Sequence, residues 1–369
     1  METVLISGAG VAGTALAYWL AHHGFAPTVV EKAPRLRPGG QAVDVRGVAL
    51  DVVDRMGILP AVRAARTRMR GMSVVDGAGT ELMRSEEMTY SGGRFDSGDV
   101  EVLRDDLVRL LYERARPGVE YVFGDATTAL HEDDHGVRVT LERGATRTFD
   151  VVVGADGLHS AVRRLAFGPE ERFLRHLGTY LAVFSAPNFL GLDNWQVWLR
   201  DEAGGGAVYP VRDNAELRVT LGFATDRLDY DYRDTRQQMA IVADQLADAG
   251  WETPRLLKAM WEAPDFYFDA MAQTHLDRWS AGRTVLLGDA GYCPSPLSGQ
   301  GTSLALAGAY VLAAELAAAG GDHRAGFAGY ERRMRPFVAL NQALATENPE
   351  GPASEESIAT AKNAMSLDQ

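Results

Sequence analysis

The chain of 369 residues contains a single cysteine, Cys293, and so cannot form an internal disulfide bond. No basic, apolar leader precedes the first strand-like residues, and with the scarcity of cysteine this predicts a cytoplasmic protein. No run of 18 consecutive apolar residues is present, so we expect neither a membrane-spanning segment nor stable membrane association.

Basic residues are also in the minority, with 37 Lys and Arg against 50 Asp and Glu, for a net charge of −13. This acidic balance argues against nucleic acid as a partner. The sequence has no HExxH motif and no paired Cys-x-x-Cys, so we expect no metal site. An apolar content of 46% is that of an ordinary globular protein, and the length suits two or three domain-sized units.

The most informative feature is a strand–turn–helix–strand unit at the N-terminus, built around Gly8, Gly10 and Gly13. In a dinucleotide-binding fold the first glycine permits a tight turn. The second lets the backbone approach a pyrophosphate, and the third lets the helix pack on the strand. The helix N-terminus then offers free N–H groups to the phosphates. Glu31, which ends the second strand, is placed to accept hydrogen bonds from an adenosine ribose. The alternative is a tight turn that binds nothing.

Two further strands each lead into an aspartate. The strand expected at residues 150–153 precedes Asp156, and the strand expected at residues 283–288 precedes Asp289. An aspartate at the C-terminal end of a strand can accept hydrogen bonds from a sugar hydroxyl. The alternative for both residues is capping of the helix that follows.

A Gly299-Gln300-Gly301 turn opens a long Ala- and Leu-rich helix that we expect at residues 303–319. The N–H groups of such a turn can approach a flat, electron-accepting ring and stabilise negative charge on it.

The expected fold class is α/β: a Rossmann-like nucleotide-binding domain with an inserted, mostly β substrate domain and C-terminal helices. The nucleotide-binding domain is predicted to be discontinuous, over residues 1–70, 95–170 and 266–345. The substrate-binding sheet is predicted over residues 71–94 and 171–265. Residues 346–369 are polar and are predicted to form a weakly ordered tail.

The three motifs, in this order, resemble those of the single-component, class A FAD-dependent aromatic hydroxylases. That family includes the para-hydroxybenzoate hydroxylase type and the tetracycline-inactivating monooxygenases. The resemblance covers most of residues 1–345 and implies tightly bound FAD, with NADPH or NADH binding transiently near Arg46, Asp156 and Arg163. The cofactor-binding residues that it implies are Gly8, Gly10, Ala12, Gly13, Glu31, Lys32, Arg46, Arg104, Asp156, Gly157, Arg163, Gly288, Asp289, Pro296, Gly299, Gly301 and Thr302. For Arg104, a surface ion pair is the alternative.

The sequence departs from the family pattern at the third motif. Tyr292 stands where the family usually has a histidine, and Thr302-Ser303 replaces a common asparagine. Since Gly288 and Asp289 remain, we expect FAD binding to survive.

The resemblance implies a monooxygenase that uses NAD(P)H and O₂ to oxygenate a small aromatic or polyketide-like molecule through a flavin hydroperoxide. The flavin then carries the chemistry, and no catalytic side chain is assigned. Two alternatives remain: a cyclase or dehydrogenase-like FAD enzyme, which Tyr292 motivates, and a non-catalytic flavin-binding protein. The chain is expected to be a monomer or homodimer. Candidate walls of the substrate pocket are Trp195, Trp198, Tyr209, Phe223, Tyr292 and Pro296.

Overall fold

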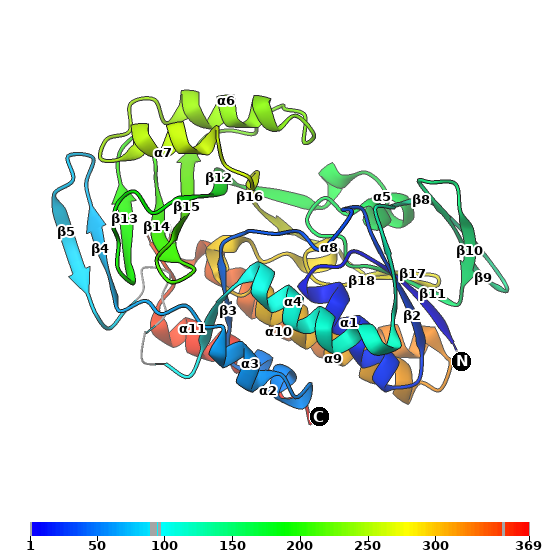
Figure 1. The fold of residues 1–369 in the computed structure, drawn as a ribbon. Helices are drawn as coiled ribbons and strands as arrows, with labels where there is room; N and C mark the ends of the chain where they lie inside the picture. Colours follow the sequence, from blue (N-terminus) through cyan, green and yellow to red (C-terminus); the bar gives the residue numbers. More distant parts are fainter. Residues whose placement is uncertain (1, 89–93, 95–96, 349–350, 369) are drawn as a thin grey trace.

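The computed structural model describes residues 2–88, 94, 97–348 and 351–368. Two sheets stand one above the other in Figure 1, with long helices beneath the lower sheet and a shorter pair above the upper one. Residues 89–93 of the predicted substrate domain, and residues 349–350 and 369 of the predicted tail, lie outside the described residues.

The lower sheet has the strand order β17-β18-β11-β1-β2-β7 within the described chain. Strand β1 lies at its centre and pairs in parallel with both β2 and β11, as a dinucleotide-binding fold requires. Only β17 runs antiparallel to its neighbour. The strands are β1 (Thr3–Ser7), β2 (Ala26–Glu31), β7 (Glu120–Phe123), β11 (Val151–Gly154), β17 (Ser280–Ala281) and β18 (Thr284–Leu286).

Alternating side chains of β1 enter two different layers. Val4 and Ile6 pack with Leu16 and Leu306 in the helical layer, whereas Leu5 packs in the opposite layer with residues of a small antiparallel sheet, β8 (Thr127–Asp133), β9 (Gly136–Leu141) and β10 (Thr146–Phe149). The elements of the helical layer are α1 (Val11–His22), α2 (Val48–Arg55), α3 (Leu59–Ala64), α4 (Arg104–Ala115), α9 (Gly301–Ala318) and α10 (His323–Glu347).

Helix α9 is long and apolar enough to cross a membrane by length and composition alone. It packs against both α1 and α10, and Leu306, Val311 and Leu312 have no exposed surface. This is the position of a core helix, and an apolar core helix meets the same length and composition criteria.

The upper sheet has the order β16-β12-β15-β14-β13-β4-β5 among the described residues. It is antiparallel apart from the β13–β4 pair. One face is covered by α6 (Thr235–Gln245) and α7 (Thr253–Met260), seen above it in Figure 1. The strands are β4 (Gly71–Val75), β5 (Glu81–Ser85), β12 (Leu174–Pro187), β13 (Trp195–Arg200), β14 (Gly205–Val211), β15 (Glu216–Ala224) and β16 (Phe266–Thr274).

The upper sheet extends beyond the predicted end of the substrate domain, because it includes strand β16. Its residues pair with β12 from Phe184↔Phe266 to Leu174↔Thr274, so the sheet continues past residue 265, where the sequence placed its boundary. Two segments connect the sheets: β3 (Ala42–Val45) pairs with β6 (Val100–Leu103), and the backbone N–H of Ala42 donates to the Tyr209 hydroxyl at 2.7 Å.

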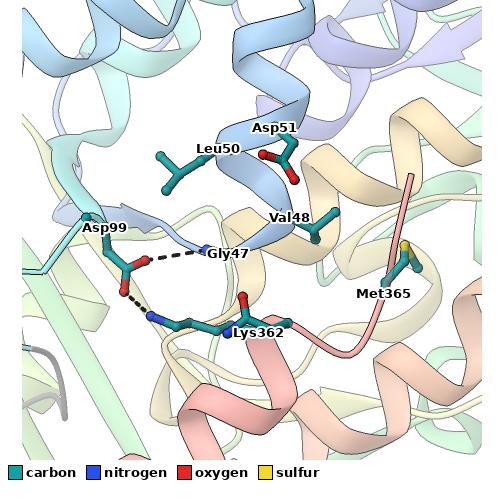
Figure 2. Close-up of a pocket in the computed structure, with 9 residues that line it drawn as sticks. Gly47, Val48, Leu50, Asp51, Asp99, Lys362 and Met365 are labelled. Atoms are coloured by element: carbon teal, nitrogen blue, oxygen red, sulfur yellow. Dashed lines mark hydrogen bonds and ion pairs between the residues drawn. The ribbon is translucent and has the colours of Figure 1, made fainter. Parts of the chain in front are cut away.

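The prediction of a weakly ordered tail is wrong for residues 355–362, which form α11 (Glu355–Lys362). Ile358 and Ala361 of this helix pack against Leu344 of α10. Lys362 Nζ binds Asp99 Oδ2 at 2.7 Å beside a pocket of about 370 Å³ between α2 and α11 (Figure 2). The segment is polar and has few apolar residues, a composition typical of disorder. Its order depends on contacts with α10, which the composition does not reveal.

Candidate FAD and substrate site

Two of the three glycines in the turn after β1 are required because a side chain at either position would collide with backbone atoms. Gly8 has φ +106°, and a Cβ there would lie 2.5 Å from the carbonyl oxygen of Ala155. A Cβ on Gly13 would collide with the carbonyl oxygen of Gly8. At Gly10, in contrast, a Cβ would meet no described atom within 4 Å. Gly10 therefore borders open space at the N-terminus of α1, which no described side chain caps, and this is the arrangement that a bound pyrophosphate needs.

Glu31 lies at the end of β2 and is buried. Its Oε2 accepts a hydrogen bond from the N–H of Ala9 at 2.9 Å, and its Oε1 accepts one from Ala33 at 2.9 Å. The carboxylate thus ties the glycine turn to β2. Each carboxylate oxygen can accept more than one hydrogen bond, so this role is compatible with the predicted contact to a ribose. Lys32, the next residue, is exposed.

The third motif meets the first one in space. Gly288 has φ +64°, and a Cβ there would lie 3.0 Å from Cβ of Ala12 in α1. Asp289 Oδ1 faces the N-terminus of α9, since a Cβ on Gly301 would lie 3.9 Å from it. Residues separated by almost 280 positions therefore line one site, with Thr302 in the first turn of α9.

Asp289 has an unusual environment. Its side chain is exposed, yet burial by the surrounding protein raises its pKa, opposed only in part by a hydrogen bond from the Cys293 thiol. The accessible carboxylate lies beside the N-terminus of α9, in the proposed cofactor site, which is called the cleft below. Such a group suits hydroxyl donors of a ligand, which replace the water that burial removes.

Arg46 supplies the clearest indication of a ligand. The side chain is 3% exposed and its Nη2 binds Asp44 Oδ2 at 2.8 Å. Its Nε and Nη1 find no hydrogen-bond partner among the described residues. The Cβ position of Gly299 lies 3.4 Å from Nη1, so the guanidinium borders the glycine turn before α9. Buried donors are rarely left unpaired, and a ring carbonyl or phosphate at this point would satisfy them.

Arg104 begins α4 and crosses the loop after β2. Its Nη2 donates to the carbonyl oxygen of Gly39 at 2.8 Å, and a Cβ on Gly40 would collide with its Nε. Burial lowers the pKa of this guanidinium. The residue therefore holds the loop that leads to Arg46 and is not the surface ion pair considered as the alternative.

Asp156 of the second motif is held by local hydrogen bonds, which its carboxylate oxygens can accept alongside those of a ligand. Asp156 Oδ2 accepts hydrogen bonds from the N–H groups of Ala161 at 2.9 Å and Val162 at 3.2 Å. These residues begin α5 (Ala161–Phe167), so Asp156 caps a helix, as the alternative reading held. Beside it, Gly157 has φ +84° with open space at its Cβ position among the described atoms.

The prediction that Arg163 binds NAD(P)H is not met in this conformation. The residue has no exposed surface, and its Nη1 donates to the carbonyl oxygen of Ala290 at 3.0 Å. Its Nη2 binds Glu170 Oε2 at 2.8 Å. Arg163 thus connects the second motif to the third within the protein interior. The sequence alone does not distinguish a buried arginine with this structural role from one that binds a phosphate.

Residues 1–343 match the family model described as an FAD binding domain. The chain belongs to this family of FAD-binding proteins. A flavin-dependent monooxygenase from an unknown prokaryotic organism is 42% identical over 343 residues, which are 93% of this chain and 88% of that protein. An uncharacterized protein of Mycobacterium tuberculosis (strain ATCC 25618 / H37Rv) is 56% identical over 353 residues, 96% of this chain and 95% of its own.

The same relationship holds in three dimensions. The crystal structure of tetracycline destructase Tet(55) matches with a TM-score of 0.88 and 38% identity, covering 100% of this chain and 99% of that chain. Tetracycline destructase Tet(51) matches with a TM-score of 0.88 and 35% identity. The protein is a class A, FAD-dependent monooxygenase. The residues present fit FAD. Gly10 borders open space at the start of α1, the accessible Asp289 lies beside Gly301, and the Arg46 Nη1 without a hydrogen-bond partner lies beside Gly299.

The face of the upper sheet turned away from α6 and α7 carries two of the predicted substrate-pocket residues, and it is called the substrate face below. Strand alternation puts Trp198 and Tyr209 on this face, where they pack near Leu103 of β6. Trp195 faces the other way and donates from Nε1 to Ser73 Oγ at 3.1 Å, on the β4–β5 hairpin. Successive residues of a strand point to opposite faces, so Trp195 points away from the face that Trp198 occupies and does not line it.

A cavity of about 310 Å³ opens on the same face. Trp198 and Phe223 border it, although the Phe223 side chain packs into the core beneath α6 and α7. Other lining residues are small or apolar: Thr179, Leu181, Gly204, Gly205, Gly206, Thr220, Gly222 and Ala224. Pro296 is exposed in the turn before Gly299, on the cofactor side.

Two pocket predictions are corrected. Tyr292 is 1% exposed and lies in the core cluster of the lower sheet. Tyr209 is 5% exposed and its hydroxyl is engaged by Ala42, so it joins the two sheets and does not line an open pocket. The place of Tyr292 in the third motif and that of Tyr209 within a strand do not reveal the direction of either side chain.

Sequence reasoning missed polar residues on the substrate face. Arg218 is 3% exposed, its Nη1 binds Asp265 Oδ2 at 3.2 Å, and its Nε finds no partner among the described residues. Gln196 is 3% exposed and accepts a hydrogen bond from Trp198 Nε1 at 3.2 Å. The alternation of polar with apolar residues in β13 and β15 could have indicated that Gln196 and Arg218 share one face of the sheet.

Proposed function

We propose that this monooxygenase takes hydride from NADPH or NADH onto FAD and uses O₂ to insert one oxygen atom into a flat, electron-rich, multi-ring small molecule. The cofactor, when bound, supplies the redox chemistry, while the protein binds, orients and shields it. Two observations carry the proposal: Arg46 has buried donors without hydrogen-bond partners beside the turn that precedes α9, and an apolar cavity lies on the face of the upper sheet turned away from α6 and α7.

The shape and lining of that cavity support the substrate class. Four glycines and the edge of Trp198 leave a broad apolar surface, which suits a planar ring system better than a charged or branched molecule. Two solved structures that this chain resembles are named tetracycline destructases. Tetracycline, a fused four-ring molecule, is therefore the first compound to test.

The cyclase or dehydrogenase-like alternative rested on Tyr292, and the structure places that side chain in the core, away from the cleft. Nothing specific in the described residues now favours it. The NAD(P)H cofactor is expected to bind transiently near the cleft and not in a Rossmann site of its own, because the single glycine fingerprint serves FAD.

The test uses FAD-saturated protein with NADPH or NADH, under ¹⁸O₂, in the presence and absence of tetracycline. We expect faster NAD(P)H consumption with tetracycline, and a product that carries one ¹⁸O atom by mass spectrometry. A product without ¹⁸O would overturn oxygen insertion. Oxygenation of other flat polycyclic compounds but not tetracycline would retain the reaction and change the substrate.

A further inference from the structure

A chain of hydrogen-bonded ionisable groups links the second motif to the upper sheet. It begins at His159, in the loop before α5. Nδ1 of His159 lies 2.8 Å from Glu170 Oε1, and Nε2 lies 3.0 Å and 3.1 Å from the two carboxylate oxygens of Asp269 in β16. One imidazole therefore connects the FAD-binding part of the molecule to the substrate sheet.

The chain continues along β16 to Tyr267. The Tyr267 hydroxyl donates to Asp269 Oδ2 at 2.9 Å, and residues two apart lie on the same face of a strand. Tyr267 is 48% exposed, yet burial and then the charge of Asp269, with a smaller effect of Asp289, raise its pKa well above the ordinary value. Tyr267 is therefore accessible to solvent, and the effect of the Asp289 charge on its pKa indicates that the two side chains lie near each other.

The groups around His159 favour its charged form. Glu170 comes from the turn after α5, Asp269 from β16, and Tyr232 lies against the ring at 4.4 Å between centroids. Arg163 binds the far oxygen of Glu170, and Arg164 acts on the same carboxylate. Burial alone would lower the pKa of His159, but the two carboxylate hydrogen bonds outweigh it and raise the pKa to about 9.

The proposed reaction requires such a path, so this inference rests on the proposed function. Oxygen insertion converts NAD(P)H, O₂, substrate and one proton into NAD(P)⁺, oxygenated substrate and water. One proton per turnover must therefore reach a cleft from which bulk water is excluded. His159 has 31% of its side chain exposed and can take that proton from solvent.

We propose that His159, Asp269 and Tyr267 form a proton relay that delivers this proton from solvent to the cleft. The protonated imidazole passes its Nε2 proton to Asp269. Asp269 passes a proton to the Tyr267 oxygen, while Tyr267 gives its own hydroxyl proton to the oxygen atom that leaves as water. His159 then takes a proton from solvent, so the three groups return to their starting state. Glu170 holds the imidazole in place through Nδ1.

A purely structural bridge between the two parts of the molecule is the competing explanation. It predicts lower stability in the variants, but no change in the pH dependence of the reaction. The pH profile therefore discriminates between the two, and stability is measured alongside it.

The variants are His159→Gln and Tyr267→Phe, with His131→Gln as a matched control because His131 is an exposed histidine on β8, in a different sheet. In the wild type, substrate-dependent oxygenation should fall as pH rises through about 9, where His159 loses its proton. In both relay variants the oxygenation rate at pH 7 should drop by roughly 100-fold. His159→Gln should also lose the fall near pH 9, whereas His131→Gln should match the wild type.

A second measurement does not depend on activity. NMR titration of the FAD-bound protein should show His159 losing its proton near pH 9, and Asp269→Asn should move that titration toward the ordinary value of about 6.5. A wild-type titration near the ordinary value would overturn the relay. So would relay variants that keep the wild-type rate and pH profile.

The outcomes separate this inference from the proposed function. A wild type without substrate-stimulated NAD(P)H oxidation overturns the proposed function and the relay together. An active wild type whose relay variants behave like the control overturns the relay alone. Since Tyr267→Phe removes only one hydroxyl and keeps the ring, it remains informative if His159→Gln fails to fold.

Discussion

The hydroxyl groups of Tyr292 and Tyr330 lie 2.8 Å apart, inside the core between the lower sheet and α10. Tyr330 also contacts the carbonyl oxygen of Leu286 at 3.1 Å, and the ring of Trp279 lies 4.6 Å from that of Tyr292. The residue that replaces the usual family histidine therefore has a packing role, and burial raises its pKa far above the ordinary value.

We expect Tyr292→Phe to lower the free energy of unfolding by about 1 kcal/mol, because it removes one buried hydrogen bond while Tyr330 keeps Leu286 as a partner. Thermal or chemical unfolding measures this. Catalytic constants and FAD affinity should stay at wild-type values. A large change in the oxygenation rate with unchanged stability would return Tyr292 to the active site.

The glycine turn offers a matched pair of substitutions. Gly13→Ala should destabilise the fold and prevent FAD binding, because its Cβ collides with the carbonyl oxygen of Gly8. Gly10→Ala should leave the stability of the apoprotein unchanged, since its φ of −78° suits alanine and its Cβ meets no described atom. It should still weaken FAD, because the methyl group occupies the space that a pyrophosphate needs. Calorimetry of the apoproteins and FAD titration separate the two effects. Equal FAD affinity in Gly10→Ala and wild type would contradict the assignment.

We expect the Asp289 carboxylate to lower the stability of the folded apoprotein while it favours FAD binding. Burial raises its pKa in the folded state, so the folded protein favours the protonated form and ionisation at neutral pH destabilises it. Asp289→Asn should therefore raise the melting temperature of the apoprotein at pH 7. The gain should shrink as pH falls through the raised pKa of the folded state and vanish below the ordinary carboxyl pKa, where both states are protonated. An unchanged or lower melting temperature at pH 7 would contradict this.

FAD affinity should move in the opposite direction. Asp289→Ala removes an acceptor for a cofactor hydroxyl, which costs roughly 1–3 kcal/mol of binding free energy. FAD titration followed by flavin fluorescence measures the loss, and the far-UV circular dichroism spectrum should stay that of the wild type. Wild-type affinity in this variant would show that Asp289 does not contact the cofactor.

Arg46→Ala should slow flavin reduction and raise the NADPH concentration needed for it, because two buried guanidinium donors next to Gly299 are lost. The variant is assayed with saturating FAD by anaerobic stopped-flow spectrophotometry at varied NADPH. Arg55→Ala is the control, since Arg55 lies on α2 outside the site and binds Asp368 near the C-terminus. Identical reduction rates and NADPH dependence in Arg46→Ala and wild type would make Arg46 a structural loop residue.

The sequence by itself determined the nucleotide-binding unit. Gly8 and Gly13 are required by contacts within a few residues or with the adjacent strand, and parallel strands buried on both faces carry continuous apolar runs. The three motifs and the discontinuous arrangement around an inserted sheet therefore followed from local sterics and patterning, whereas the FAD family came from the resemblance of the three motifs to known proteins.

Only the tertiary structure decided which of the similar residues serve the site. Asp156 and Asp289 both follow a buried strand and a glycine, yet Asp156 caps α5 while Asp289 faces the cleft. Strand alternation did not decide which face of the sheet Trp195 points to. The sequence indicated only that Tyr267 lies near a strand. Whether a side chain meets a ligand, a helix or the core depends on which distant element packs against it, and that information lies in contacts far apart in the sequence.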